Sequence, residues 1–426
     1  MKKTYWIACV LWVATAQAQV APLPEPAPVA PLTLEAAWRR AEDKSVSLIA
    51  ARAAVISAEG AAEDTRGLLW NNPELTTDRA RRQSPQPDLT TPRYREWGAG
   101  LSQTLEIAGQ QGYRREASRQ ELAAARYAEM TARRDLRAEV ERRFVQVLVL
   151  QARIDNEREA VALVESTATF AGKRVSAGED SRLDANVALI DAGRARNQLA
   201  LLVDQLLEAK SRLAELLQWP AESLPMPVGE LDTPVPLPPL SDVLTSARER
   251  TLVKSLYAKE AAAQNKLDLE RAARFPDVTV GFGVAREGPE QFREKVTTLT
   301  LTVPLPLFKR NAGNVAQAQA DRMRAQSDRE AGEREVEASV RALWQRVQNL
   351  QRRVQALRDT VVPALEDNQR LSQKALREGE LSLAQQVLIN RQLLDGRRDL
   401  LEAVSDLRLS RIALAQAAGD TPDRAR

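Results

Sequence analysis

Residues 336–361 read VEASVRALWQRVQNLQRRVQALRDTV, and this stretch decides the fold. Its apolar residues recur in alternating steps of four and three, at Val336, Val340, Leu343, Val347, Leu350, Val354, Leu357 and Val361. This period places one narrow apolar seam along an α-helix, which a partner helix must cover. Helix breakers other than Gly332 are absent from residues 314–362. The pattern therefore predicts one continuous helix about 70 Å long.

A matching seam lies in the first half of the chain. Its residues are Leu136, Val140, Phe144, Val147, Leu150, Ile154 and Val161, which align with Val336, Val340, Trp344, Val347, Leu350, Val354 and Val361. A second heptad run, Leu199, Leu202, Leu206, Ala209, Leu213 and Leu216, aligns with Leu400, Ala403, Leu407, Ser410, Leu414 and Ala417. Because two separate runs agree, with one residue of slip, we interpret the chain as a tandem duplication.

The composition favours long helices and argues against a nucleic-acid partner. Of the 426 residues, 44% are hydrophobic and 28% charged but only 4% aromatic, a balance typical of coiled coils. The 61 basic residues nearly balance the 58 acidic ones, which leaves a net charge of +3. We therefore interpret the many arginines as solvated helix faces and expect no nucleic acid among the partners.

Residues 1–18 have the features of a secretory signal peptide. Lys2 and Lys3 precede an apolar run that is too short to span a membrane, and Ala16-Gln17-Ala18 forms a small-x-small cleavage site. No other stretch has the roughly 18 apolar residues of a transmembrane helix. Cleavage after Ala18 removes Cys9, the only cysteine, and the chain has no histidine. We therefore expect an exported protein with no cofactor and no transition-metal site.

Proline-rich segments divide the remaining chain. Residues 19–32 form an extended arm, and residues 220–239 form a linker that cannot be helical. The linker separates a first repeat, residues 33–219, from a second repeat, residues 240–419, and residues 420–426 are a polar tail. Each repeat is predicted to open with one helix, from Leu34 to about Leu69 and from Leu240 to about Phe275.

Each repeat then changes to a hydrophobic period of two, which predicts strands with one apolar and one polar face. The strands are expected at about 276–286 and 295–307, at about 94–107, and, mainly by symmetry, at about 73–82. Their lengths suit tilted strands that cross a bilayer, although two hairpins of a soluble sheet fit the same pattern. Four membrane strands cannot close a barrel, so neighbouring subunits must supply the rest.

The chain resembles the TolC-like outer membrane efflux family over residues 33–419. The resemblance rests on the order helix, strand, strand, long helix, shorter helix, twice over. Local matches are LSQTLEIAG at 101–109, VPLPLF at 303–308, NAG at 311–313, and the turns around Gly178 and Gly379. The first motif is similar to a strand end of the heavy-metal (CzcC-like) branch.

The resemblance implies a mainly α fold with transmembrane β-strands. It implies a homotrimer in the bacterial outer membrane, whose twelve strands form a β-barrel continued by an α-helical barrel in the periplasm. The implied partners are a periplasmic adaptor (membrane fusion) protein, an inner-membrane pump of the resistance-nodulation-division type, and outer membrane lipid. Residues 83–93 and 287–293 are then expected outside the cell.

Two helix turns are the candidate contact site. Gly178 and Gly379 suit chain reversal, and Ser181 and Ser382 suit capping of the next helix. The resemblance implies that these tips meet the adaptor and close the periplasmic entrance. Basic residues precede both turns and are expected either to assist the last helix carbonyls or to pair with a neighbouring tip. These basic residues are Arg174 and Arg377.

An acidic gate at the entrance is a further expectation from the resemblance. Asp184 holds the expected place six residues after Gly178, whereas Gln385 holds it in the second repeat. An acidic ring would otherwise use Asp180, Glu179, Glu378 or Glu380. These acids fit equally well as solvated residues near helix starts, where the helix dipole favours them.

The expected function is a passive efflux duct that exports heavy-metal cations as the outer component of a tripartite system. The alternatives are the same duct for drugs or other small toxins, and a soluble periplasmic coiled-coil adaptor or scaffold. A periplasmic hydrolase is disfavoured because the sequence offers no nucleophile and base arrangement, so we predict that the protein is not an enzyme.

Overall fold

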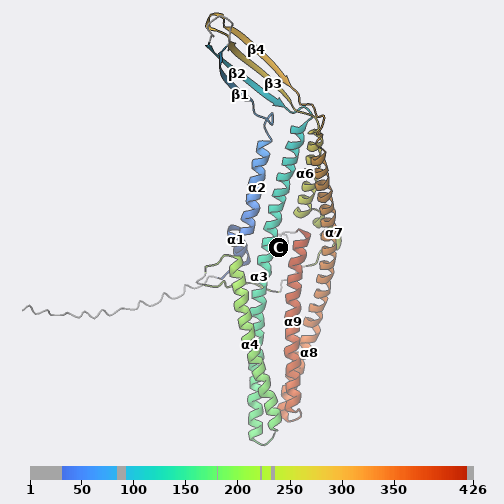
Figure 1. Cartoon of the computed structure of the whole chain (residues 1–426). Helices are drawn as coiled ribbons and strands as arrows, with labels where there is room; N and C mark the ends of the chain where they lie inside the picture. The colour runs from blue at the N-terminus through green and yellow to red at the C-terminus, as the bar shows by residue number, and fades with distance from the viewer. Residues whose placement is uncertain (1–30, 84–92, 180, 221–222, 232–235, 420–426) are drawn as a thin grey trace, which may run out of the picture.

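The computed structural model describes residues 31–83, 93–179, 181–220, 223–231 and 236–419. The predicted signal peptide 1–18, nearly all of the arm 19–32 and the tail 420–426 lie outside these residues, as do 84–92 of the predicted external loop and parts of the linker 220–239. Figure 1 shows an elongated molecule, with a small sheet at one end and two helical hairpins that run to the other.

The first half contains four helices and two strands among its described residues. They are α1 (Leu34–Lys44), α2 (Val46–Asp64), β1 (Glu74–Gln83), β2 (Arg93–Leu105), α3 (Gln110–Ser176) and α4 (Arg182–Leu216). The second half repeats this order. It has α5 (Leu240–Arg248), α6 (Thr251–Ala272), β3 (Val278–Glu287), the 3₁₀ turn η1 (Glu290–Phe292), β4 (Glu294–Thr302), α7 (Ala312–Ala356), the π-helical η2 (Leu357–Val361), α8 (Val362–Glu378) and α9 (Leu383–Ala418).

The predicted seam of the second half is confirmed and forms the core between α7 and α9. Val340 and Val347 are fully buried, and they share a cluster with Ala403 and Leu407 of α9. In the first half Val140 and Val147 are likewise fully buried, against residues of α1 and α4. Each half therefore buries its own heptad seam, as two-stranded helix packing requires.

The predicted continuous helix is interrupted. Five residues, Leu357–Val361, form a π-helical segment that leads into α8, whose first turn contains Pro363. A proline has no N–H to donate and its ring crowds the preceding turn, so a wider turn accommodates it without ending the helix. Val361, the last residue of the seam and the last of this segment, is 39% exposed.

The opening helix of each half is also divided, where one helix was predicted. α1 and α2 meet at Ser45, which is extended (φ −66°, ψ 122°) and whose Oγ accepts a hydrogen bond from the N–H of Leu48 at 3.5 Å. Local capping thus starts a new helix inside the apolar pattern. Within the described residues, no single helix is long and apolar enough to cross a membrane, although α1 and α2, bent by 52°, reach that criterion together.

The four strands form one antiparallel sheet in the order β1-β2-β3-β4. The central pair, β2 and β3, joins the two halves, with Leu101 opposite Phe282. β1 pairs along its whole length with β2 despite its weak alternation. β4 ends at Thr302, short of the predicted residue 307, because Pro304 and Pro306 cannot donate hydrogen bonds to a ladder.

Candidate functional site

At the ends of the two helical hairpins, furthest from the sheet, the chain reverses through equivalent glycines (Figure 1). Gly178 has φ +77° and Gly379 has φ +79°, the left-handed region that favours glycine. The N–H of the next residue bonds back across the turn, from Glu179 to the Arg174 carbonyl and from Glu380 to the Ala375 carbonyl, both at 2.9 Å. These bonds satisfy carbonyls at the ends of α3 and α8.

The next helix at each tip begins with a serine cap. Ser181 Oγ accepts from the N–H of Asp184 at 3.2 Å, and Ser382 Oγ accepts from the N–H of Gln385 at 3.3 Å. Two of the gate candidates, Asp184 and Gln385, belong to these caps. Asp184 Oδ2 accepts from Ser181 Oγ at 2.8 Å, and Gln385 Oε1 accepts from the N–H of Ser382 at 3.1 Å. The same cap geometry explains why these side chains occupy matching positions in the two halves.

The remaining tip candidates engage locally or face solvent. Arg174 Nη1 lies 3.5 Å from Glu179 Oε2 and its guanidinium is 5.8 Å from the centre of the Phe170 ring. Glu378 lies 3.9 Å from Lys374, also within its own hairpin. Arg377 and Glu380 are exposed. Asp180 lies outside the described residues.

Polar contacts between the two hairpins lie nearer the sheet than the tips do, and the heptad pattern does not predict them. Arg391 of α9 pairs with Asp191 of α4, with Nε 2.8 Å from Oδ2, and the hydrogen bond to Asp191 raises the pKa of Arg391. Next to it Asn390 Nδ2 donates to Thr167 Oγ1 of α3 at 3.1 Å. Gln386 Nε2 donates to Asn390 Oδ1 at 2.9 Å, and both of these α9 side chains are buried.

Two buried carboxylates of α3 continue this series toward the sheet. Glu157, whose side chain is 2% exposed, lies 2.7 Å from Arg398 Nη2, and Glu141 lies 3.0 Å from Arg408 Nη2. Burial raises the pKa of Glu141, and the nearby Arg408 charge opposes that effect. A heptad pattern gives no sign of such pairs, because the two partners belong to different halves of the chain.

The sheet is the second candidate site, since its register gives each face a distinct character. One face, called the apolar face, carries mostly exposed apolar side chains. They are Leu75, Trp97, Ala99, Leu101, Leu105, Val278, Val280, Phe282, Val284, Leu299 and Leu301. The other face, called the polar face, carries Thr76, Gly98, Ser102, Thr104, Thr279, Gly281, Thr298 and Thr300 among others. In β3 the apolar-face residues are the more exposed ones, the reverse of a water-soluble sheet.

Charge is also divided between the two faces of the strands. Alternation places Glu74, Asp78, Glu96, Glu287 and Glu294 on the polar face. Among the described strand residues the only base on that face is Arg82, 3.3 Å from Glu96. Glu287 and Glu294 stand directly opposite each other. Nevertheless, no group of three or more side chains suited to hold a metal ion occurs among the described residues. The polar face is therefore acidic without forming a metal site.

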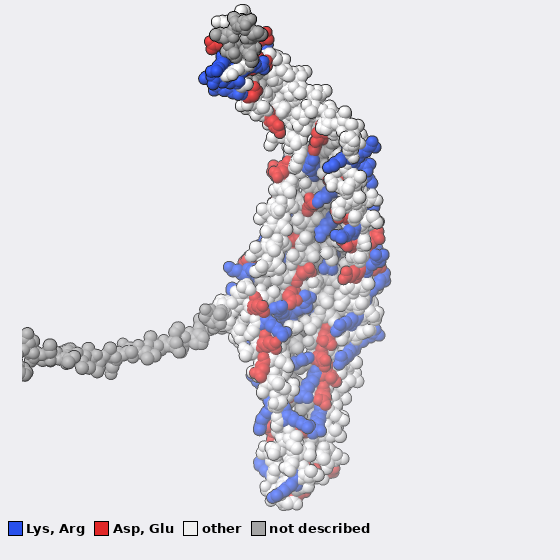
Figure 2. Space-filling view, in the orientation of Figure 1, with Lys and Arg blue, Asp and Glu red and all other residues white. Residues whose placement is uncertain are grey.

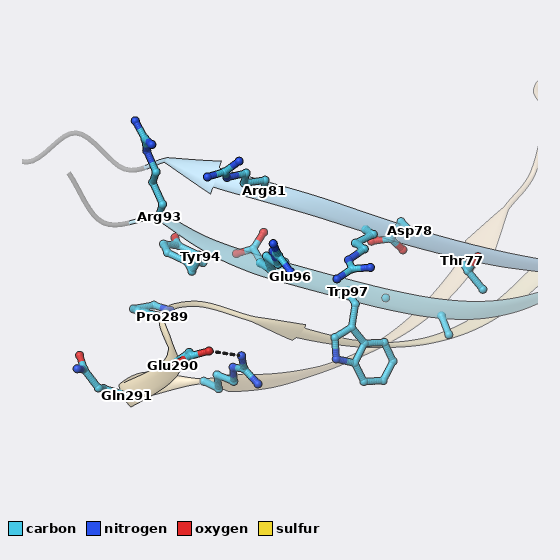
Figure 3. Close-up of a pocket in the computed structure, with 15 residues that line it drawn as sticks. Thr77, Asp78, Arg81, Arg93, Tyr94, Glu96, Trp97, Pro289, Glu290 and Gln291 are labelled. Carbon is cyan, nitrogen blue, oxygen red and sulfur yellow. Dashed lines mark hydrogen bonds and ion pairs between the residues drawn. The ribbon is translucent and has the colours of Figure 1, made fainter.

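Near the loops the strands border an open hollow of about 1030 Å³ (Figure 3). Its lining includes Asp78 and Glu96 of the polar face and Arg81 and Arg93 of the other face. Figure 3 shows Arg81 and Arg93 at the loop end of β1 and β2. Both faces thus become charged toward the end of the sheet that is furthest from the helices.

The sequence matches the profile of the family described as outer membrane efflux protein, over residues 38–217 and 245–420. The cobalt-zinc-cadmium resistance protein CzcC of Cupriavidus metallidurans is 29% identical over 295 residues, 68% of each chain. Crystal structures of CusC share the fold, with a TM-score of 0.75, 18% identity, and coverage of 92% of this chain and 93% of that one.

Two further solved structures are similar in fold. The outer-membrane channel OprN has a TM-score of 0.77 at 17% identity, with 91% of this chain and 90% of that chain covered. The outer membrane protein VceC of Vibrio cholerae has a TM-score of 0.73 at 17% identity, with coverage of 91% and 96%.

Proposed function

Because this chain belongs to the outer membrane efflux protein family, we propose that three copies of it form a passive duct. The four strands of each copy contribute to one twelve-stranded barrel in the outer membrane. The helices continue the barrel as a tube in the periplasm. Such a duct needs no catalytic residue, because the driving energy comes from a pump in the inner membrane.

The single observation that carries this proposal is the open sheet with its apolar face exposed. β1 and β4 are edge strands, so one side of each has no ladder partner among the residues that the structure describes. In hydrocarbon each unpaired backbone group costs several kcal/mol. This cost is avoided if β4 of one copy pairs with β1 of the next. The acidic polar face then lines the lumen, and Leu299 and Phe282 of the apolar face contact lipid.

Disulfide cross-linking tests the trimer. In a Cys9→Ser background, Thr76→Cys on β1 is combined in turn with Thr298→Cys, Thr300→Cys and Thr302→Cys on β4. Within one chain these strands are three strand spacings, about 14 Å, apart, so an intramolecular bond cannot form. We expect at least one combination to give a covalent trimer in outer membranes. A chain that stays monomeric in water without detergent contradicts the proposal.

The hairpin tips are proposed to bind the periplasmic adaptor, which connects the duct to a pump of the resistance-nodulation-division type. The exposure of Arg377, Gly379 and Glu380 supports this role. Arg377→Glu is expected to reduce co-purification with the adaptor encoded nearby. Arg370→Glu, an exposed arginine further up α8, is the matched control and should bind normally. Equal binding by both variants and the wild type removes the tips from the contact.

The proposed cargo is heavy-metal cations. The likeness to CzcC supports this class, and so does the excess of carboxylates on the polar face, which favours cations in a narrow lumen. A strain without the gene should lose tolerance to zinc, cobalt or cadmium and regain it on complementation. If tolerance changes only toward drugs or other small toxins, the duct serves those cargoes instead. A soluble periplasmic adaptor is not favoured, because it would leave the apolar face in water.

A further inference from the structure

The basic residues of the strands are gathered on the apolar face. In the four strands, Arg79, Arg81, Arg93, Arg95, Arg286 and Lys295 all lie on this face, and no acidic residue shares it. We call these six residues the cationic belt. They are placed by register as well as by alternation. Arg79, Trp97, Arg286 and Lys295 form one row across the sheet, and Arg81 faces Arg95 in the next row.

The cationic belt begins in the row of Trp97, where the apolar band ends, and extends from there to the loop end of the sheet. The band runs from Trp97 to Leu105 along β2, about 27 Å of strand, which is the length of a strand that crosses a membrane. Trp97 is 45% exposed at the border between band and belt. Aromatic side chains at such a border mark the level of lipid headgroups. Figure 2 shows the blue cluster at this end above a largely uncharged surface.

The charged groups of all six belt residues are exposed and are not paired with carboxylates of the described residues, which leaves them available to a ligand. Arg286 instead stacks over the Trp97 ring, at 5.8 Å from its centre. By contrast Arg82, the neighbour of Arg81 on the polar face, pairs with the buried Glu96. The carboxylate of Glu290 lines the same hollow as Arg79, Arg81, Arg93 and Arg95, but its described ion pair is with Arg293.

We propose that the cationic belt binds the phosphate groups of the lipid in the outer leaflet, the lipid A part of lipopolysaccharide. This inference rests on the proposed barrel, which turns the apolar face to lipid and repeats the belt three times around it. Arginine binds phosphate through two parallel hydrogen bonds, and long basic side chains reach from an apolar surface to the headgroup level. If the basic residues served only solubility, they would not all need to lie on the face opposite the acidic residues of the same strands.

The test measures binding of bis-phosphorylated lipid A to the purified full-length protein in mild detergent. The probe variant is Arg79→Gln/Arg81→Gln/Arg95→Gln. The matched control, Arg82→Gln/Arg158→Gln/Arg212→Gln, removes the same charge from the polar face and from exposed helix positions. Each basic residue near a phosphate-bearing surface contributes about a fivefold change in affinity, so the probe variant should bind about 100-fold more weakly. The control should bind like the wild type.

Three further measurements make the result decisive. The wild type and the probe variant should bind lipid A stripped of its phosphates with the same affinity. Affinity of the wild type should fall as salt rises, which needs no variant at all. Competition by millimolar inorganic phosphate should be weak, because a free ion lacks the acyl chains that occupy the apolar band. Equal binding of intact and stripped lipid A, or complete displacement by free phosphate, overturns the inference.

The oligomeric state, measured on the same samples, separates the two proposals. If the protein is a trimer but binds intact and phosphate-stripped lipid A equally well, the lipid inference is refuted and the duct proposal stands. A wild-type chain that forms no trimer refutes the duct, on which the lipid inference depends.

Discussion

At the scale of single residues, the least tolerant positions are the carboxylates buried between the hairpins. Glu157 of α3 is almost fully buried, and its described partner Arg398 comes from α9. Arg398→Ala leaves this charge without compensation. We expect a loss of about 2 kcal/mol, less than for a fully buried pair because Arg398 is 43% exposed. Arg158→Ala, in an exposed pair with Asp155, should change stability by less than about 0.5 kcal/mol. Thermal denaturation of the purified variants compares the two.

The pH dependence of stability is a second expectation at this scale. Burial raises the pKa of Glu141 above its ordinary value of 4.5. The folded state therefore binds this proton more tightly than the unfolded state. The contribution to stability is complete below the ordinary pKa and is lost as the pH rises through the raised, folded-state pKa. Glu141→Gln keeps a partner for Arg408 and should flatten this part of the profile. An identical slope in wild type and variant contradicts the assignment.

At the scale of elements, neighbouring positions of one strand should differ sharply. Leu299 lies on the apolar face of β4 and Thr300 on the polar face. Leu299→Arg places a charge in lipid at a cost of about 2–4 kcal/mol, so the amount of assembled protein in the outer membrane should fall. Thr300→Arg should assemble normally and alter conductance only. Immunoblots of unheated outer membranes measure the assembled fraction, and equal assembly of the two variants would falsify the facial assignment.

The helices show how local signals interact with an apolar period. The glycine and serine signals at both tips predicted the turns, because a positive φ and a cap depend on adjacent residues only. The break at Ser45 was missed because the apolar pattern continues across it. Gly332, the one breaker in the predicted helix 314–362, has a tertiary explanation. A Cβ there would lie 2.5 Å from Leu256 Cδ1 of α6.

At the scale of the whole molecule, the acidic polar face predicts the ion preference of the duct. Asp78→Asn/Glu287→Gln/Glu294→Gln removes three carboxylates per chain from the proposed lumen. Because fixed carboxylates concentrate cations in a narrow pore, the reversal potential in a salt gradient should move toward that of a nonselective pore. Planar-bilayer recordings measure this shift. An unchanged potential would assign the preference to another part of the duct.

The sequence by itself determined the properties that depend on neighbouring residues. The period of 3.5 around Val340 and Val347 determined the long helices, and the period of two around Phe282 and Leu299 determined which side chains share a face of one strand. The duplication and the two tip turns were also readable, because each repeats the same short signals in both halves.

Only the tertiary structure decided how distant segments meet. The pairing of β2 with β3 brings Trp97 beside Arg286, and this register assembles the cationic belt from residues of both halves. Arg398 finds Glu157 across 241 positions of sequence. Local patterns specify the type and facing of each element. Which elements pack against each other depends on contacts between residues that are far apart in the sequence, and a short stretch of sequence does not contain both partners.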